Sequence, residues 1–527
     1  MSAFIQRVAG GGGACQVLLP DLAATRRLGM LLASWFGVHD ILTLSGDLGA
    51  GKTELARAIV RASAGNERTD VPSPTFPIVI TYDFPRFRVV HSDLYRIVEE
   101  EELDELGWDE LADDALVLVE WADRAGDRLP ETHLDIMLHL APDLGPEARV
   151  AILTGHGAMA ERLNRMHLAE VLIESAGFGA SDRVFMQGDA SSRTYTRLVE
   201  QGRSAILMNA PPKADGPPLR QGLPYSRLVH LAEDVKPFVA MDRALLAQGF
   251  SAPVIYAADL DAGLLVLEDL GGEGVVAGDP PAPIPERYEA AAQVLATLHS
   301  RPLPHTLHVA PRVERPLPAY DAPAFLAEVD LMLDWYLPAF GKPVDGVVRE
   351  EFHLLWRTAL KPVLDEPQTW VLRDYHSPNL IWLPAREGLQ KVGLIDFQDA
   401  VTGPAAYDVA SLAQDARVDM PEQLELHLVG QYVRMRRAQD PYFDVRGFAR
   451  AYALMGAQRA TKILGIFTRL DRRDGKPHYL RHLPRIRRYL ARCIAHQDLA
   501  GLRGWYDAIL PAQDIPPKDL PAQDQLS

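Results

Sequence analysis

Eight consecutive residues near the N-terminus have the types and spacing of a phosphate-binding loop: Gly46-Asp47-Leu48-Gly49-Ala50-Gly51-Lys52-Thr53. Glycines let backbone N–H groups wrap phosphate oxygens, a lysine reaches the terminal phosphates, and a threonine hydroxyl can ligate Mg²⁺. An apolar run at residues 41–44 precedes the loop and a helix-compatible stretch at 53–62 follows it, which is the context that the motif requires. The sequence therefore predicts an ATP–Mg²⁺ site formed by all eight residues.

A second pattern with chemical meaning lies in the C-terminal half of the chain. Asp374 and Asn379 form a D-x-x-x-x-N motif, and Leu394-Ile395-Asp396 begins fifteen residues beyond Asn379. This is the spacing of a kinase catalytic loop followed by a metal-binding aspartate. Asp374 would orient the substrate hydroxyl and accept its proton, while Asn379 and Asp396 would hold Mg²⁺ on the ATP phosphates.

Nucleotide contacts for this second site are expected upstream of the motif. Residues 188–193 form a turn between two predicted strands, from which Ser191, Ser192 and Arg193 would cover the phosphates. Glu268 and Leu270 follow a buried strand and would hydrogen-bond adenine through their backbone, although an ordinary strand-ending turn is the alternative. The strand at 205–209 has no lysine, so backbone, metal or Arg193 would have to contact the α- and β-phosphates.

The chain of 527 residues is too long for one core, so several domains are expected to position these residues. Strands mixed with helices predict an α/β domain at 1–155 with a mainly parallel sheet around the phosphate-binding loop. A strand-rich lobe at 156–272 and a helical lobe at 273–510 predict a two-lobed, kinase-like α+β domain. Repeated Pro-Ala-Gln-Asp at 511–527 predicts a disordered tail.

Composition argues against several classes of protein. The net charge is −17, and residues 1–155 carry 13 basic and 25 acidic side chains, a balance of −12, which argues against binding nucleic acid by bulk charge. The two cysteines, Cys15 and Cys493, are far apart, so a disulfide framework or zinc site is not expected. Without an apolar stretch of membrane-spanning length or an apolar leader, a cytoplasmic protein with no membrane association is expected.

The N-terminal part resembles the TsaE family, the ATPases of the bacterial system that makes threonylcarbamoyladenosine in tRNA. The resemblance covers about residues 15–153 and rests on the phosphate-binding loop together with residues 72–76, 91–96 and 118–121. It implies that Thr75 lies near the γ-phosphate, that Asp93 lies near Mg²⁺, and that Glu120 positions metal or attacking water. It also implies partners, TsaB and TsaD, and only indirect contact with tRNA.

Residues 160–505 resemble the aminoglycoside phosphotransferase-like kinases, and more narrowly the anomeric kinases of N-acetylmuramate and N-acetylglucosamine (AmgK). The narrower resemblance rests on residues 188–193, 207–212, 372–380 and 462–467. It implies transfer of the ATP γ-phosphate to the anomeric hydroxyl of an amino sugar in peptidoglycan recycling. Choline, an aminoglycoside or another small alcohol remains an alternative substrate, and one of the two ATP sites could instead serve assembly or regulation.

Overall fold

The computed structural model describes residues 4–8, 13–74, 78–97, 102–105, 113–186, 193–213, 215–220, 222–342 and 344–510. Three residues with predicted nucleotide contacts, Thr75, Ser191 and Ser192, lie outside these ranges, as does the predicted tail at 511–527. Internal contacts divide the chain into two compact units, residues 1–211 with 255–269 and residues 212–254 with 270–527.

The first unit contains an eight-stranded mixed sheet in the order β1-β2-β8-β7-β3-β6-β5-β4. Its four central strands, β7, β3, β6 and β5, run parallel, and the outer pairs are antiparallel. The predicted, largely parallel α/β arrangement is therefore confirmed. The strands are β1 (Ile5–Arg7), β2 (Cys15–Leu19), β3 (Ile41–Gly46), β4 (Val79–Asp83), β5 (Arg88–Asp93), β6 (Ala115–Glu120), β7 (Leu134–Leu140) and β8 (Arg149–Gly155).

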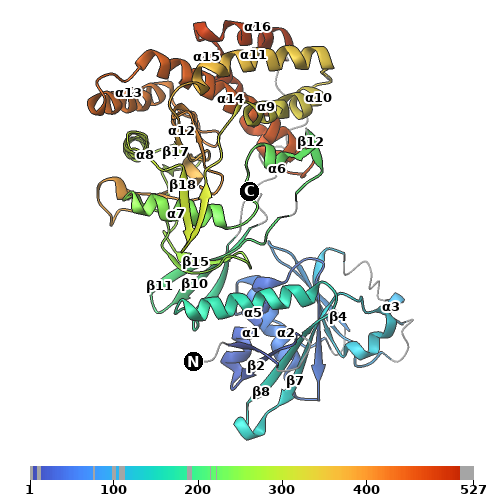
Figure 1. Cartoon of the computed structure of the whole chain (residues 1–527). Coiled ribbons are helices and arrows are strands. Elements are labelled where there is room, and N and C mark those ends of the chain that lie inside the picture. The colour runs from blue at the N-terminus through green and yellow to red at the C-terminus, as the bar shows by residue number, and fades with distance from the viewer. Residues whose placement is uncertain are drawn as a thin grey trace. The chain divides into compact units, whose positions relative to one another are not determined.

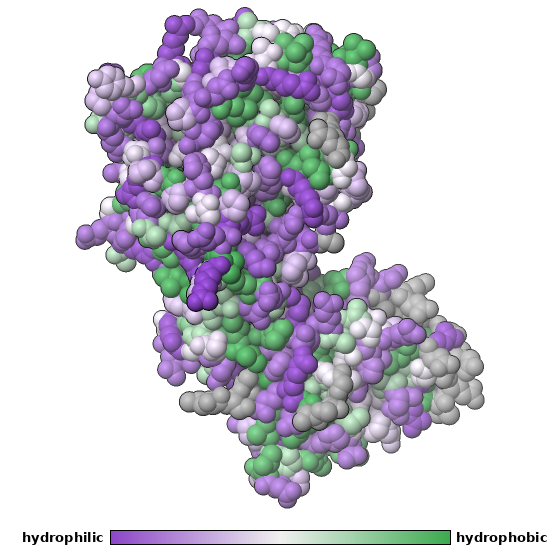
Figure 2. All heavy atoms as spheres, viewed as in Figure 1, coloured by the Kyte–Doolittle hydropathy of each residue, from purple (hydrophilic) through white to green (hydrophobic). Residues whose placement is uncertain are grey.

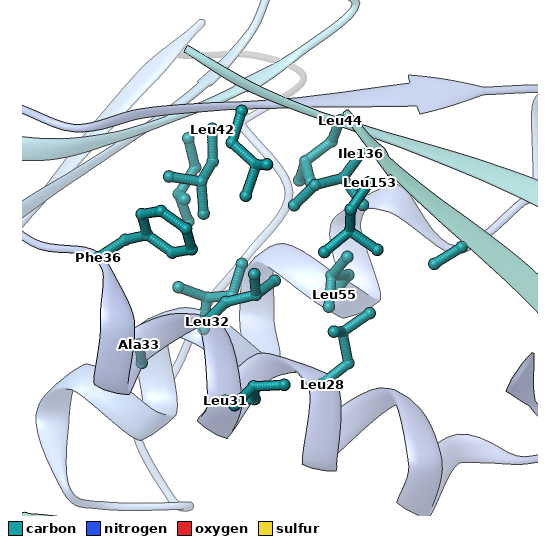
Figure 3. Packing of buried hydrophobic residues seen from close by; sticks show 14 of the residues in the cluster. Leu28, Leu31, Leu32, Ala33, Phe36, Leu42, Leu44, Leu55, Ile136 and Leu153 are labelled. Carbon is teal, nitrogen blue, oxygen red and sulfur yellow. The ribbon is translucent and has the colours of Figure 1, made fainter. Parts of the chain in front are cut away.

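Helices α1 (Leu22–Trp35) and α2 (Lys52–Ala64) pack against this sheet, and the short helix α3 (Glu102–Glu105) contributes Leu103 to a second buried cluster with Val90 and Val117. Figure 3 shows apolar side chains of α1 pointing toward strand residues such as Leu42 and Ile136, with Leu55 of α2 between them. The two helices approach closely, since a Cβ atom at Gly29 would lie 2.5 Å from the Cβ atom of Ala58. The packing of α1 and α2 on the sheet thus fixes the position of the N-terminus of α2, and with it the position of the loop that precedes α2.

A second, five-stranded antiparallel sheet in the same unit has the order β14-β15-β11-β10-β9. Its strands are β9 (Asp182–Met186), β10 (Thr194–Glu200), β11 (Arg203–Asn209), β14 (Ile255–Asp259) and β15 (Leu264–Glu268). Helix α5 (Met159–Ser175) packs on both sheets (Figure 1). Its N-terminal half contributes Leu163 and Met166 to the core of the larger sheet, and its C-terminal half contributes Leu172 and Ile173 to that of the smaller one. The domain boundary at residue 156 stays a prediction.

The second unit is mainly helical. Its longest helix, α14 (Val445–Arg472), packs against α9, α12 and α15, and a Cβ atom at Gly465 would lie 2.3 Å from the carbonyl carbon of Leu331 in α9. The other helices are α6 (Tyr225–Leu228), α7 (Lys236–Ala247), α8 (Pro285–Leu298), α9 (Ala322–Leu331), α10 (Leu337–Ala339), α11 (Gly346–Leu364), α12 (Ala406–Ala413), α13 (Glu422–Gln439), α15 (Leu483–Ile494) and α16 (Ala500–Ile509).

Short antiparallel strand pairs connect these helices. The pairs are β12 (Pro218–Arg220) with β13 (Leu223–Pro224), β16 (Val276–Ala277) with β17 (Ala282–Pro283), β18 (Thr306–Ala310) with β19 (Val313–Pro316), β20 (Thr369–Val371) with β23 (Val401–Gly403), and β21 (Leu380–Trp382) with β22 (Val392–Leu394). The antiparallel sheet followed in sequence by this helical part agrees with the predicted kinase-like fold.

One face of the molecule is largely polar. Figure 2 shows hydrophilic residues over most of the visible face, with hydrophobic residues scattered among them. Within the described residues, no helix is both long and apolar enough to cross a membrane.

Candidate active sites

The phosphate-binding loop joins the end of β3 to the start of α2. Its three glycines, Gly46, Gly49 and Gly51, have φ angles of 131°, 80° and 105°, which residues with a side chain rarely adopt. A Cβ atom at Gly46 would also lie 2.3 Å from the carbonyl oxygen of Leu138. Glycine is therefore required here by backbone conformation and by space, and the loop can turn its N–H groups inward around an anion.

Lys52 and Thr53, the first two residues of α2, lie at this loop. The Lys52 ammonium donates to the carbonyl oxygens of Gly46 (2.8 Å) and Asp47 (3.1 Å), and lies 4.1 Å from the ring centroid of Trp121. The Thr53 hydroxyl donates to Oε2 of Glu120 at 2.9 Å. Trp121, which follows β6, therefore packs on Lys52, and Glu120 reaches the helix that follows the loop.

Two carboxylates meet where β5 and β6 end. Asp93 and Glu120 are paired in register on these parallel strands, both are buried, and Nε2 of His91 lies 2.9 Å from the other carboxylate oxygen of Glu120. Burial raises the pKa of Asp93, and the negative charge of Glu120 raises it further. The hydrogen bond from the Tyr95 N–H acts in the opposite direction but does not outweigh burial. Two neighbouring carboxylates attract a divalent cation, and the oxygen donors present fit Mg²⁺.

The second candidate site lies in the helical unit, where β20 leads into residues 372–380. Asn379 ends a 3₁₀ turn (Ser377–Asn379), and its side-chain Nδ2 donates to the Asp374 carbonyl oxygen at 2.9 Å. Its own carbonyl oxygen accepts from the Ile395 N–H at 3.2 Å, which ties the loop to the segment that carries Asp396. The structure thus brings Asp374, Asn379 and Asp396 together.

The side chains of Asn379 and Asp396 both have oxygen atoms that could bind a metal ion. Because the Asn379 amide nitrogen is bonded to Asp374, the amide oxygen is the atom left to face a cation. Asp396 has a left-handed φ of 59° and accepts from Nε2 of Gln398 at 2.9 Å. An amide oxygen and a carboxylate are ligands that Mg²⁺ prefers, so the pair fits that ion.

The electrostatics around Asp374 favour its ionised form. Burial by itself raises the pKa of this carboxyl, but His376, Lys462 and Arg459 outweigh burial and lower it. Asp374 is therefore a carboxylate at neutral pH and can accept a hydrogen bond from a hydroxyl group.

Arg373, immediately before Asp374, is held in a rare backbone conformation with a φ of 67°. The N–H groups of Leu372 and Arg373 donate to the two carboxylate oxygens of Asp408 in α12, at 2.6 and 2.9 Å. The Arg373 guanidinium forms an ion pair with Glu328 of α9. These contacts hold the loop in one conformation, and they allow Arg373 to keep its strained backbone next to Asp374.

Glu328 is the centre of a fully buried polar cluster. It accepts from Lys462 Nζ (2.7 Å) and Gln458 Nε2 (2.8 Å), both on α14, and from Tyr320 and Arg373. Burial by itself raises the pKa of Glu328, but Lys462 and Arg373 outweigh it and lower the pKa to about 2. Helices α9 and α14 and the catalytic loop are therefore joined through one carboxylate.

Substituting Glu328 by Gln is expected to destabilise the helical unit by about 3–5 kcal/mol at pH 7, because it leaves Lys462 and Arg373 without their buried counter-charge. Urea unfolding of the full chain measures the loss. Glu366→Gln, which breaks the more exposed pair with Arg450, should cost about 1 kcal/mol or less. Since the folded pKa is depressed, the contribution of Glu328 is complete above its ordinary pKa of 4.5 and is lost as pH falls toward about 2. Equal losses for the two variants would contradict the prediction.

The remaining predicted nucleotide contacts are divided between the two units. Arg193 precedes β10, and Glu268 is the last residue of β15, opposite Ala205 of β11; both belong to the first unit. Leu270 belongs to the second unit. As the sequence indicated, β11 offers no lysine, and the nearby Arg197 of β10 pairs with Asp269 at 2.7 Å.

Several supporting residues were not predicted from the sequence: Glu328, Asp408 and Arg459. Each is buried and charged. Asp408 is the one charged residue of α12, and α9 carries Glu328 and Asp330 among apolar residues; burying a charge is costly unless it is paired. Carboxylates within largely apolar helices were therefore a usable signal for a structural partner, although not for which partner.

Comparisons with known proteins find two families in different parts of the chain. The family model described as threonylcarbamoyl adenosine biosynthesis protein TsaE matches residues 19–144, and that described as phosphotransferase enzyme family matches residues 183–442. An N-acetylmuramate/N-acetylglucosamine kinase of Caulobacter vibrioides is 36% identical over 354 residues, which is 65% of this chain and 95% of the relative. A tRNA threonylcarbamoyladenosine biosynthesis protein TsaE of Rickettsia bellii is 36% identical over 128 residues, 24% of this chain and 88% of the relative.

A solved structure of an ethanolamine kinase from Plasmodium vivax is also similar, with a TM-score of 0.43 and 11% identity, covering 64% of this chain and 90% of that one.

Proposed function

We propose that this chain, which belongs to the TsaE family through its N-terminal part and to the phosphotransferase enzyme family through its C-terminal part, carries two separate ATP-dependent activities. The two sets of residues have different chemistry. One combines a glycine-rich loop with Lys52, and the other combines Asp374 with two oxygen ligands.

The first activity is that of an accessory ATPase for threonylcarbamoyladenosine modification of tRNA. It is supported by the convergence of Thr53, Asp93 and Glu120 at the mouth of the loop. Thr53 and Asp93 would hold Mg²⁺, which supplies charge neutralisation at the phosphates. Glu120, bonded to His91, would position the attacking water. Proteins like TsaB and TsaD would be the partners, and the acidic domain would meet tRNA only through them.

The second activity is a sugar kinase that transfers the ATP γ-phosphate to the anomeric hydroxyl of N-acetylmuramate or N-acetylglucosamine. The observation that carries it is that hydrogen bonds connect the segments of Asp374, Asn379 and Asp396. The chain also aligns with 95% of the length of an amino-sugar kinase. Asp374 orients the hydroxyl and accepts its proton as the O–P bond forms and ADP leaves. Asn379 and Asp396 would hold Mg²⁺, and Ser191, Ser192, Arg193, Glu268 and Leu270 would contact the nucleotide.

Incubation of the full chain with ATP and a panel of hydroxyl compounds tests the substrate. We expect phosphate transfer to N-acetylmuramate and N-acetylglucosamine, with ³¹P NMR showing a sugar 1-phosphate. The 1-O-methyl glycoside of N-acetylglucosamine, which lacks the anomeric hydroxyl, is the matched control and should accept no phosphate. Transfer to choline or an aminoglycoside with none to the two amino sugars would overturn the assignment.

A further inference from the structure

The peptide plane between Arg373 and Asp374 is held from both of its edges. On one edge, the Asp374 N–H donates to the Leu372 carbonyl oxygen at 2.8 Å. On the other, the Arg373 carbonyl oxygen accepts from Nη1 of Arg459 at 2.8 Å and from the Ser411 hydroxyl at 3.3 Å. Rotation of this plane would turn the Cα–Cβ bond of Asp374, so whatever fixes the plane also fixes the direction of the carboxylate.

Arg459 makes the shorter of the two contacts to the carbonyl. It lies on α14, 86 residues beyond Arg373, is 8% exposed, and stands 4.8 Å from the ring centroid of Tyr407. A charged donor forms a stronger hydrogen bond than a hydroxyl does, and here it acts in a buried site. Arg459 also lowers the pKa of Asp374 by its charge, so it acts on this residue both electrostatically and through the backbone of the loop.

We propose that Arg459 is a positioning residue of the kinase: by binding the Arg373 carbonyl it fixes the peptide plane that sets the direction of the Asp374 carboxylate. This inference rests on the proposed role of Asp374 as the group that accepts the hydroxyl proton. It assigns to α14 a share in catalysis without contact with either substrate. Misplacing a reacting group by about 1 Å can cost about 10²-fold in rate, which sets the size of the effect.

Arg459→Met and Arg459→Lys test the proposal in the full chain. We expect Arg459→Met to lower kcat by about 10²-fold with little change in KM for ATP, and Arg459→Lys to recover part of the loss because a donor is kept. The matched control is Arg469→Met, on the same helix, where the guanidinium lies 5.8 Å from the Tyr225 ring centroid and away from the loop. It should leave kcat within about twofold of the unchanged protein.

A double-mutant cycle separates positioning from mere structural support. If Arg459 acts through Asp374, Arg459→Met should have no further effect on kcat when Asp374 is already Asn. A similar loss in both backgrounds, accompanied by an equal fall in melting temperature, would overturn the proposal.

Hydrogen–deuterium exchange gives a readout that needs no sugar substrate. Arg459→Met should speed exchange of the amides at 372–380, whereas Arg469→Met should not. If the unchanged protein phosphorylates no amino sugar but this exchange result is found, the proposed substrate fails and the positioning of the loop stands. Unchanged exchange at 372–380 in Arg459→Met would overturn the positioning itself.

Discussion

Replacing Asp374 with Asn is expected to lower sugar phosphorylation by about 10²- to 10⁴-fold, the usual contribution of a positioned acid or base. Asparagine keeps the size of the side chain and leaves the main-chain carbonyl that accepts from Asn379, so the loop should remain in place. What is lost is the carboxylate that His376, Lys462 and Arg459 keep ionised. Initial rates of sugar 1-phosphate formation measure the effect.

The same variant tests whether the two sites are independent. Hydrolysis of ATP at the phosphate-binding loop should be unchanged in Asp374→Asn, because that loop and its carboxylates lie in the other unit. Asp365→Asn, an exposed aspartate that pairs with Lys361, is the control and should leave both activities intact. Full kinase activity in Asp374→Asn would remove this residue from the mechanism.

Replacing Lys52 with Ala is expected to lower ATP hydrolysis by the N-terminal part by about 10²- to 10³-fold, the range seen when a donor aimed at developing charge is removed. The ammonium lies between the loop carbonyls and Trp121, where a bound phosphate chain would meet it. The rate is to be measured with the partner proteins TsaB and TsaD present. Cells that carry only this variant should lose threonylcarbamoyladenosine from their tRNA.

Arg61→Ala serves as the control for Lys52→Ala, because Arg61 lies at the far end of the same helix and donates to the Thr69 carbonyl. It should keep the ATPase rate. Sugar phosphorylation should be unaffected by either change. Loss of both activities in Lys52→Ala would contradict two independent sites, and normal tRNA modification in cells would contradict the role proposed for the N-terminal part.

The sequence predicted correctly those features that short stretches of chain define. The loop from Gly46 to Thr53 is recognisable because each of its glycines has a positive φ angle that residues with a side chain rarely adopt. Helical spacing at residues 21–38 predicts five core positions, Leu22, Leu28, Leu31, Leu32 and Phe36, and the last four are buried. Leu22 is 42% exposed; it is the first residue of α1, and periodicity does not show where a helix begins.

Contacts between distant residues were beyond such patterns. Glu328 and Lys462 are in contact although 134 residues separate them in the sequence, and Arg373 and Arg459 are in contact although 86 residues separate them. No local spacing predicts either pair. Likewise, helical spacing is expected at about residues 158–176, but that spacing does not show that α5 packs on both sheets of the first unit. The two families could be inferred from the sequence, since their motifs need particular side chains at fixed short spacings. The tertiary structure alone decided what holds Asp374 in place, because buried charges must find partners wherever folding brings them.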